Sequence, residues 1–107
     1  MSAFLNYRER VGSRAEKFYK DTLFKGEHLM VGINCLEPGQ IQTVHDHAGA
    51  DKMYVVLEGS GQFTVGQDSH AARSGDVVWA PAGVPHGVEN NGKDRLVLLV
   101  GIGPPPA

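Results

Sequence analysis

Hydrophobic and polar residues alternate over short stretches along most of the chain, and glycine, proline, asparagine or aspartate interrupts each stretch. Alternation with a period of two is typical of a β-strand that turns one face toward a core. From about residue 17 onward we therefore expect a series of strands joined by tight turns. The predicted strands cover residues 17–24, 28–36, 41–47, 52–57, 62–65, 76–80, 84–90 and 95–101.

The number and length of these strands predict one all-β domain. About eight short strands in a chain of 107 residues favour a β-sandwich or a small jelly-roll barrel. The first two strands should pair as a hairpin around Lys25 and Gly26. We expect residues 1–16 to form an N-terminal arm with at most one helical turn, residues 17–102 the single barrel domain, and residues 103–107 an extended proline-rich tail.

Two stretches, residues 53–57 and 96–100, are apolar at every position and so on both faces of a strand. In a two-layer barrel one face of a strand packs inside, while the other normally meets water. The outer face of these strands therefore needs a cover, either from the N-terminal hairpin or from a second copy of the chain. We expect a homodimer.

Composition and charge narrow the class of protein further. The formal net charge of −2 divides into +3 over residues 1–25 and −5 over the remainder, and no basic stripe with interleaved aromatic residues follows. This pattern predicts no nucleic-acid partner, and no apolar run is long enough for a membrane span. A single cysteine, Cys35, excludes an internal disulfide and a cysteine-based metal cluster. With no apolar signal segment near the start, we expect a cytoplasmic protein.

Three of the five histidines lie in predicted strands. His45 and His47 are two residues apart, so an extended strand places both rings on one face, and His86 falls in a later strand. Neutral imidazoles held on rigid strands suit divalent zinc, iron, manganese, nickel or copper. An isolated H-x-H pair is also common on an exposed edge strand, so this pair alone does not decide between the two interpretations. His28 and His70 lie in polar segments, and we expect both at the surface.

The sequence around the three histidines resembles the two motifs of the cupin superfamily. The first motif has the form G-x5-H-x-H-x3-4-E-x6-G, and its matching residues are Gly39, His45, His47 and Gly59. The second has the form G-x5-P-x-G-x2-H-x3-N, and its matching residues are Gly75, Pro81, Gly83, His86 and Asn90. Together the two motifs cover residues 39–90, about half of the chain.

This resemblance implies a double-stranded β-helix, the jelly-roll barrel of cupins, with one divalent transition-metal ion near one mouth. His45, His47 and His86 correspond to metal ligands of the family. At the position of the family's ligand glutamate, however, this chain has Lys52. Asp51 could reach the metal through a shift of the loop, Lys52 could turn into the pocket and pair with an anionic substrate, or Lys52 could extend to water and leave a three-histidine site.

Strand parity predicts which side chains share the pocket face with the histidines and with Lys52. Gln40 and Gln42 have the opposite parity to His45 and are expected to face away. The residues expected to face inward are Ile41, Thr43, Tyr54, Val56, Val84, Val88 and Asn90.

A site with three neutral ligands leaves the metal its full charge and several open coordination positions. By analogy with similar cupins, we favour a metal-dependent enzyme of dioxygenase type that acts on a small chelating substrate. Lys52 would favour an anionic substrate, and Lys52 and Tyr54 are the candidate catalytic residues. One alternative is a metal-assisted isomerase, epimerase or lyase acting on a sugar or small acid, in which Tyr54 moves a proton. Another is a non-catalytic module that binds a small molecule.

Overall fold

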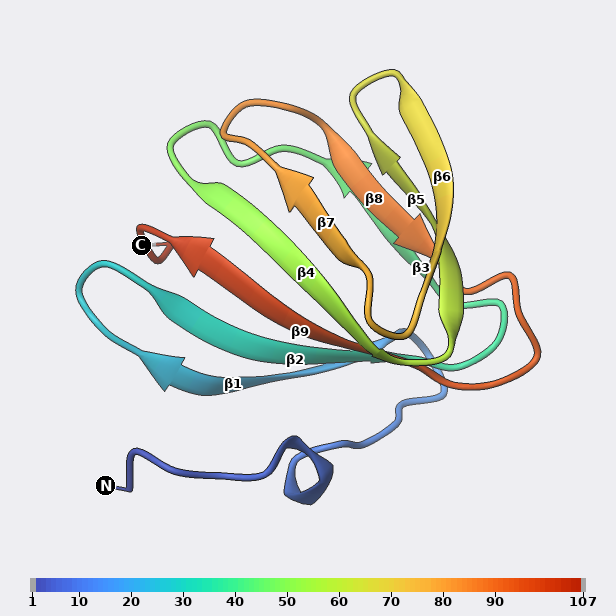
Figure 1. Cartoon of the computed structure of the whole chain (residues 1–107), viewed down its shortest axis with the longest axis horizontal. Coiled ribbons are helices and arrows are strands. Elements are labelled where there is room, and N and C mark those ends of the chain that lie inside the picture. The colour runs from blue at the N-terminus through green and yellow to red at the C-terminus, as the bar shows by residue number, and fades with distance from the viewer. Residues whose placement is uncertain (1, 107) are drawn as a thin grey trace.

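Two antiparallel β-sheets face each other in the computed structural model, which describes residues 2–106 (Figure 1). The five-stranded sheet has the order β1-β2-β9-β4-β7, and the four-stranded sheet has the order β3-β8-β5-β6. No helix in this described range is long and apolar enough to cross a membrane. The elements are η1 (Tyr7–Glu9), β1 (Tyr19–Lys25), β2 (Met30–Leu36), β3 (Ile41–His45), β4 (Asp51–Glu58), β5 (Ser60–Val65), β6 (Asp68–Arg73), β7 (Val77–Ala80), β8 (His86–Glu89) and β9 (Leu96–Gly103).

The all-β prediction is confirmed, and every expected strand is present with its ends shifted by at most two residues. The pattern did not predict β6, the edge strand of the four-stranded sheet. Only Ala72 of this strand is buried, and its other residues are exposed. Such a strand carries no hydrophobic alternation that could have predicted it.

The main core fills the space between the two sheets. The five-stranded sheet contributes Tyr54, Leu96 and Leu98, and the four-stranded sheet contributes Phe63 and Val88. Each of these side chains is at most 3% exposed. Alternate residues of the same strands point outward, as the period of two requires.

The N-terminal arm covers part of the outer face of the five-stranded sheet. Leu5, Tyr7 and Val11 pack against a second buried cluster that includes Ile33 and Cys35. The hairpin β1-β2 belongs to the sheet itself, so the expectation that this hairpin would act as the cover is wrong, and the arm before it takes that place.

Polar contacts anchor the arm. The Tyr7 hydroxyl donates a hydrogen bond of 2.9 Å to Glu58, and the Arg10 guanidinium forms an ion pair of 2.7 Å with Asp21 on β1. Part of the arm's basic charge is thus used within the chain.

Another part of the outer face, at β4 and β7, remains open. Met53 and Val55 of β4 pair with Trp79 and Val77 of β7, and these four side chains point outward beside Leu99 of β9. Val77 is 65% exposed and Trp79 is 56% exposed. An apolar sheet face of this kind is typical of an interaction surface. The homodimer stays a prediction.

A β-bulge in β3 sets the inner wall of the barrel. Gln42 pairs with Val88 and His45 pairs with His86, so three steps along β3 oppose two steps along β8. Gly87 lies behind the bulge, where a Cβ atom would come within 2.8 Å of the Gln42 carbonyl oxygen. The extra residue lets Gln42 and His45 both face inward.

The bulge overturns three of the parity predictions made for β3. Gln42 is buried instead of facing away, whereas Ile41 and Thr43 are exposed instead of facing inward. Regular alternation fails here because one residue is added between positions 42 and 45.

Candidate metal centre and its pocket

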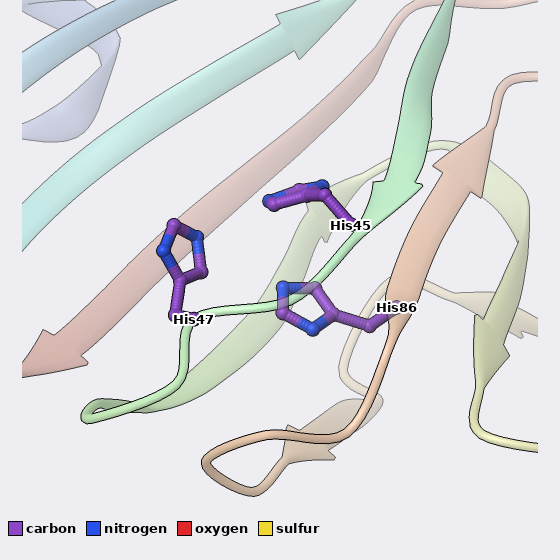
Figure 2. A group of neighbouring side chains, drawn as sticks. All are labelled: His45, His47 and His86. Atoms are coloured by element: carbon purple, nitrogen blue, oxygen red, sulfur yellow. The ribbon is translucent and has the colours of Figure 1, made fainter.

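His45, His47 and His86 converge at one end of the barrel (Figure 2). One nitrogen from each ring lies within 4.8 Å of the other two. His45 ends β3, His47 follows in the next loop, and His86 begins β8. The three residues therefore form a group that could hold a metal ion, as the spacing of the sequence motifs implied.

Backbone carbonyls orient two of the imidazole rings. His45 Nδ1 lies 2.7 Å from the Thr43 oxygen, and His86 Nδ1 lies 3.0 Å from the Val84 oxygen. Because a carbonyl only accepts, each Nδ1 carries the proton and each Nε2 offers its lone pair. His86 Nε2 is buried without a hydrogen-bond partner among the described residues. A divalent metal ion would satisfy this atom, so the three imidazoles fit such an ion.

Electrostatics at the site favour neutral histidines. Burial lowers the pKa of His47 and of His86, and the nearby charge of Lys52 lowers both further. A neutral imidazole is the form that binds metal, so these shifts help the rings to act as ligands at neutral pH.

A pocket of about 440 Å³ opens beside the histidines. The five-stranded sheet supplies its apolar wall, Met30, Val100 and Ile102, and the four-stranded sheet supplies His45 on the opposite side. Pro106 of the C-terminal tail also contributes to the lining. The polar residues that line the pocket are Lys20, Asp21, Thr22, Asn34, Gln42, His45, His47 and Lys52.

Lys52 turns into this pocket. Its side chain is buried, with 6% of the residue exposed, and Nζ lies 4.9 Å from the centroid of the Tyr54 ring. Burial, with a smaller contribution from the charge of Lys20, lowers the pKa of Lys52 to about 8. No carboxylate of residues 2–106 forms an ion pair with it. Pairing with an anionic substrate stays a prediction.

Asp51 lies away from the histidines. Its side chain is exposed, and Oδ1 accepts a hydrogen bond of 2.9 Å from the backbone N–H of Ala82. The carboxylate thus closes the turn between β7 and β8, and within the described chain it is outside the group of potential metal ligands.

Tyr54 is fully buried beside the pocket, as parity predicted. Its hydroxyl donates a hydrogen bond of 2.5 Å to Gln42 Oε1, and burial raises the pKa of the phenol well above its usual range. A proton-transfer role for Tyr54 stays a prediction, and the contact that the structure provides is with Gln42.

Asn90 is buried as expected, but it serves the fold. Its Nδ2 donates to the carbonyl oxygens of Leu36 and Asp94, and its Oδ1 accepts from the backbone N–H of Gly92. The amide nitrogen and the amide oxygen of Asn90 thus both have hydrogen-bond partners, and the residue is not among those that line the pocket. Of the remaining inward predictions, Val56 and Val88 are in the core and Val84 is half-buried.

Sequence reasoning missed Asn34, Gln42 and Lys20 as pocket residues. Asn34 had a usable signal, because it is the one strongly polar residue in the apolar stretch MVGINCL that forms β2. Gln42 could not be found by parity, because the bulge reverses the alternation. Lys20 could be placed at the pocket only from the strand register, because it lies opposite Asn34 where β1 pairs with β2.

A two-sheet jelly roll with a three-histidine group at one mouth is the architecture of a metal-binding cupin. The sequence model of the cupin domain family matches residues 32–102, which is more than half of the chain. The protein therefore belongs to the cupin family, as the two motifs implied.

Known proteins resemble the chain over most of its length. The crystal structure of TT1209 from Thermus thermophilus is 35% identical, with a TM-score of 0.94, and the alignment covers 98% of this chain and 100% of that one. An RmlC-like cupin protein from Desulfovibrio desulfuricans is 30% identical, with a TM-score of 0.86, and the alignment covers 99% and 100%. The oxalate-binding protein of Thermotoga maritima is 33% identical over 64 residues, which are 60% of this chain and 53% of that protein.

Proposed function

We propose that the protein is a metal-dependent enzyme of dioxygenase type that acts on a small, anionic, chelating substrate. One observation carries this proposal: His45 and His47 line the same pocket as the buried Lys52, and one nitrogen of His86 lies within 4.8 Å of a nitrogen on each of these two rings. Three neutral ligands leave coordination positions free, whereas a structural metal is more often closed by four protein ligands. The proposed metal is a divalent transition ion, and we favour ferrous iron.

The side chains of the pocket have separable roles in this proposal. When bound, ferrous iron supplies Lewis acidity and a source of electrons for dioxygen chemistry. His45 and His86 present oriented Nε2 lone pairs, because backbone carbonyls hold their Nδ1 protons. The ammonium of Lys52 attracts the negative charge of the substrate. The apolar wall of Met30 and Ile102 limits access of water.

Metal content and oxygen uptake test the proposal. The protein is purified without oxygen, its metals are measured, and the metal-free form is reloaded separately with iron, zinc, manganese, nickel and copper. Oxygen uptake is then followed with an enolisable 1,3-diketone, a small thiol and a hydroxylated aromatic acid. We expect uptake with the iron form alone and its loss in His86→Ala. Stoichiometric iron without oxygen uptake on any of these substrates would contradict the proposal.

A second candidate function is non-catalytic binding of a small acid. The similarity to the oxalate-binding protein of Thermotoga maritima favours it. This function predicts that small carboxylic acids raise the thermal midpoint of the metal-loaded protein while no substrate is consumed. An isomerase or lyase would instead consume substrate without oxygen. We rank it lower because Tyr54, its candidate proton carrier, is buried with a raised pKa.

We also propose that the protein forms a homodimer through the open part of its outer face, at β4 and β7. Closed dimers use the same patch on both copies, and the exposed Val77 and Trp79 lie beside the outward-facing Met53 and Val55. Light scattering at micromolar concentration should report a mass of two chains, and Trp79→Lys should reduce it to one. A wild-type protein that scatters as a monomer would refute the assembly.

A further inference from the structure

Three buried polar side chains in the pocket have hydrogen-bonding atoms without a protein partner. Asn34 and Lys52 are each 6% exposed and Gln42 is 8% exposed, and they come from three strands, β2, β4 and β3. In the described chain the side chains of Asn34 and Lys52 form no hydrogen bond, and Gln42 uses only Oε1, which accepts from Tyr54. None of their free atoms is fully enclosed, because among the side chains of residues 2–106 the one fully buried nitrogen or oxygen without a hydrogen-bond partner is His86 Nε2.

A second buried asparagine, in contrast, has hydrogen-bond partners in the protein. Asn90 is completely buried, and its amide is satisfied by two backbone carbonyls and one backbone N–H. A buried amide without partners lowers stability, so proteins usually pair it, as here at Asn90. The Asn34 side chain forms no such hydrogen bond within the described chain. Its amide and the two other free groups are instead available to whatever occupies the pocket.

The free groups are mostly hydrogen-bond donors. Lys52 offers an ammonium, and Gln42 offers its NH₂ because the Tyr54 hydroxyl already occupies its oxygen. Lys20 pairs across the sheet with Asn34 and adds positive charge at the same pocket. Asp21, the one carboxylate that lines the pocket within residues 2–106, is held by Arg10 in an ion pair of 2.7 Å. Such a set of donors matches an oxyanion.

The oxyanion site and the histidines belong to one cavity. The pocket of about 440 Å³ has His45 and His47 in its lining together with Asn34, Gln42 and Lys52. This volume is in the range of small-molecule sites. A ligand that chelates a metal at the histidines can therefore also reach the donors, provided that it has a second acceptor group.

We infer that the ligand of this pocket is a small dianion with two oxyanion ends, one for the metal and one, a carboxylate, for Lys52, Gln42 and Asn34. The inference rests on the proposed metal site and names the class of molecule that the site takes. Asn34 and Gln42 are then residues that determine specificity for the second carboxylate. A monocarboxylate of equal length makes only the metal contact and leaves the three donors without a partner.

Calorimetric titration of the zinc-loaded full chain tests the inference, because zinc holds the site without oxygen chemistry. The probes are malonate, succinate and glutarate, each compared with the monocarboxylate of equal carbon number, propionate, butyrate and valerate. At least one dicarboxylate should bind about tenfold or more tightly than its monocarboxylate, since it adds charge-assisted hydrogen bonds. Equal affinity of dicarboxylates and monocarboxylates throughout the series would overturn the inference.

Two variants locate the second carboxylate. Asn34→Leu and Lys52→Met should each reduce the dicarboxylate preference, while both variants still hold one zinc per chain. Asn91→Leu, at an exposed asparagine outside the pocket lining, is the matched control and should keep the preference. Asn34→Leu should also melt at a higher temperature than the wild type, because it removes an unpartnered amide. A preference that survives in both variants would refute the assigned donors.

The zinc content measured before titration separates this inference from the proposed function. One zinc per chain with no dicarboxylate preference overturns the inference and leaves the metal site standing. One zinc per chain with the preference, but no oxygen uptake by the iron form, supports the inference and contradicts the dioxygenase. A chain that holds no zinc overturns both.

Discussion

Replacing Lys52 by methionine should stabilise the metal-free protein. The lysine is 6% exposed, and burial lowers its pKa from the ordinary 10.5 to about 8. Each tenfold change in proton affinity is worth about 1.4 kcal/mol, so holding this ammonium in the folded state at pH 7 costs roughly 3 kcal/mol. Methionine has a similar length and no charge, and it removes that cost.

The gain should depend on pH in a defined window. A lysine whose pKa is lower in the folded protein binds fewer protons there than in the unfolded chain, so wild-type stability rises between pH 8 and 10.5. The advantage of Lys52→Met is therefore complete below pH 8 and disappears as the pH approaches 10.5. A gain of about 3 kcal/mol would raise the melting temperature by ~10 °C or more in a domain of this size.

Urea unfolding in the presence of a chelator, followed by circular dichroism between pH 7 and pH 10, measures this effect. Lys25→Met changes an exposed lysine of β1 and should stay within about 0.5 kcal/mol of the wild type. If Lys52→Met matched the wild type at pH 7, the ammonium would be hydrated in the folded protein. If its advantage were the same at pH 10 as at pH 7, the gain would not come from the charge. Either result would refute the prediction.

Three further predictions concern the metal centre and the buried amide of the fold. Single changes to alanine at the ligand positions should reduce bound zinc by about tenfold or more, measured by elemental analysis, whereas the surface positions should keep it. The ligand positions are His45, His47 and His86, and the control positions are His28 and His70. Because the pKa of His47 and of His86 is lowered, the folded state resists their protonation, and the metal-free protein should lose stability as the pH falls below about 6.5. An unfolding midpoint that stays constant from pH 7.5 to pH 5 would contradict this. Asn90→Leu should cost about 3 kcal/mol or more in urea unfolding, because two carbonyls and one N–H lose their partner, and a cost under ~1 kcal/mol would refute its structural role.

The fold and the metal ligands could be predicted because their signals are local. Alternation marks the strands one by one, and the spacing around His45, His47 and His86 is a property of short segments. The prediction failed where the fold depends on pairing between strands. The polar edge strand β6 gains its order from β5, and the bulge in β3 exists only relative to β8.

The donors of the pocket illustrate the same limit. Asn34 and Lys52 are distant in sequence, and only the order β2-β9-β4 of the sheet brings them to one cavity. Whether a buried amide serves the fold or a ligand depends on its hydrogen bonds. Asn34 and Asn90 look alike as buried asparagines, and the structure alone shows that one is bonded and the other is free.

The bulge of β3 is what allows the pocket to have this pair of side chains. Gln42 and His45 are three residues apart, so in a regular strand of the same length they would face opposite sides, and either the glutamine or the imidazole would lie outside the barrel. The segment should therefore tolerate exchanges at the exposed Thr43 and Val44, whereas a side chain at Gly87 would press on the bulge and disturb the pocket. An engineer who transfers this centre to another barrel would have to carry the irregular spacing with it, and not the histidines alone.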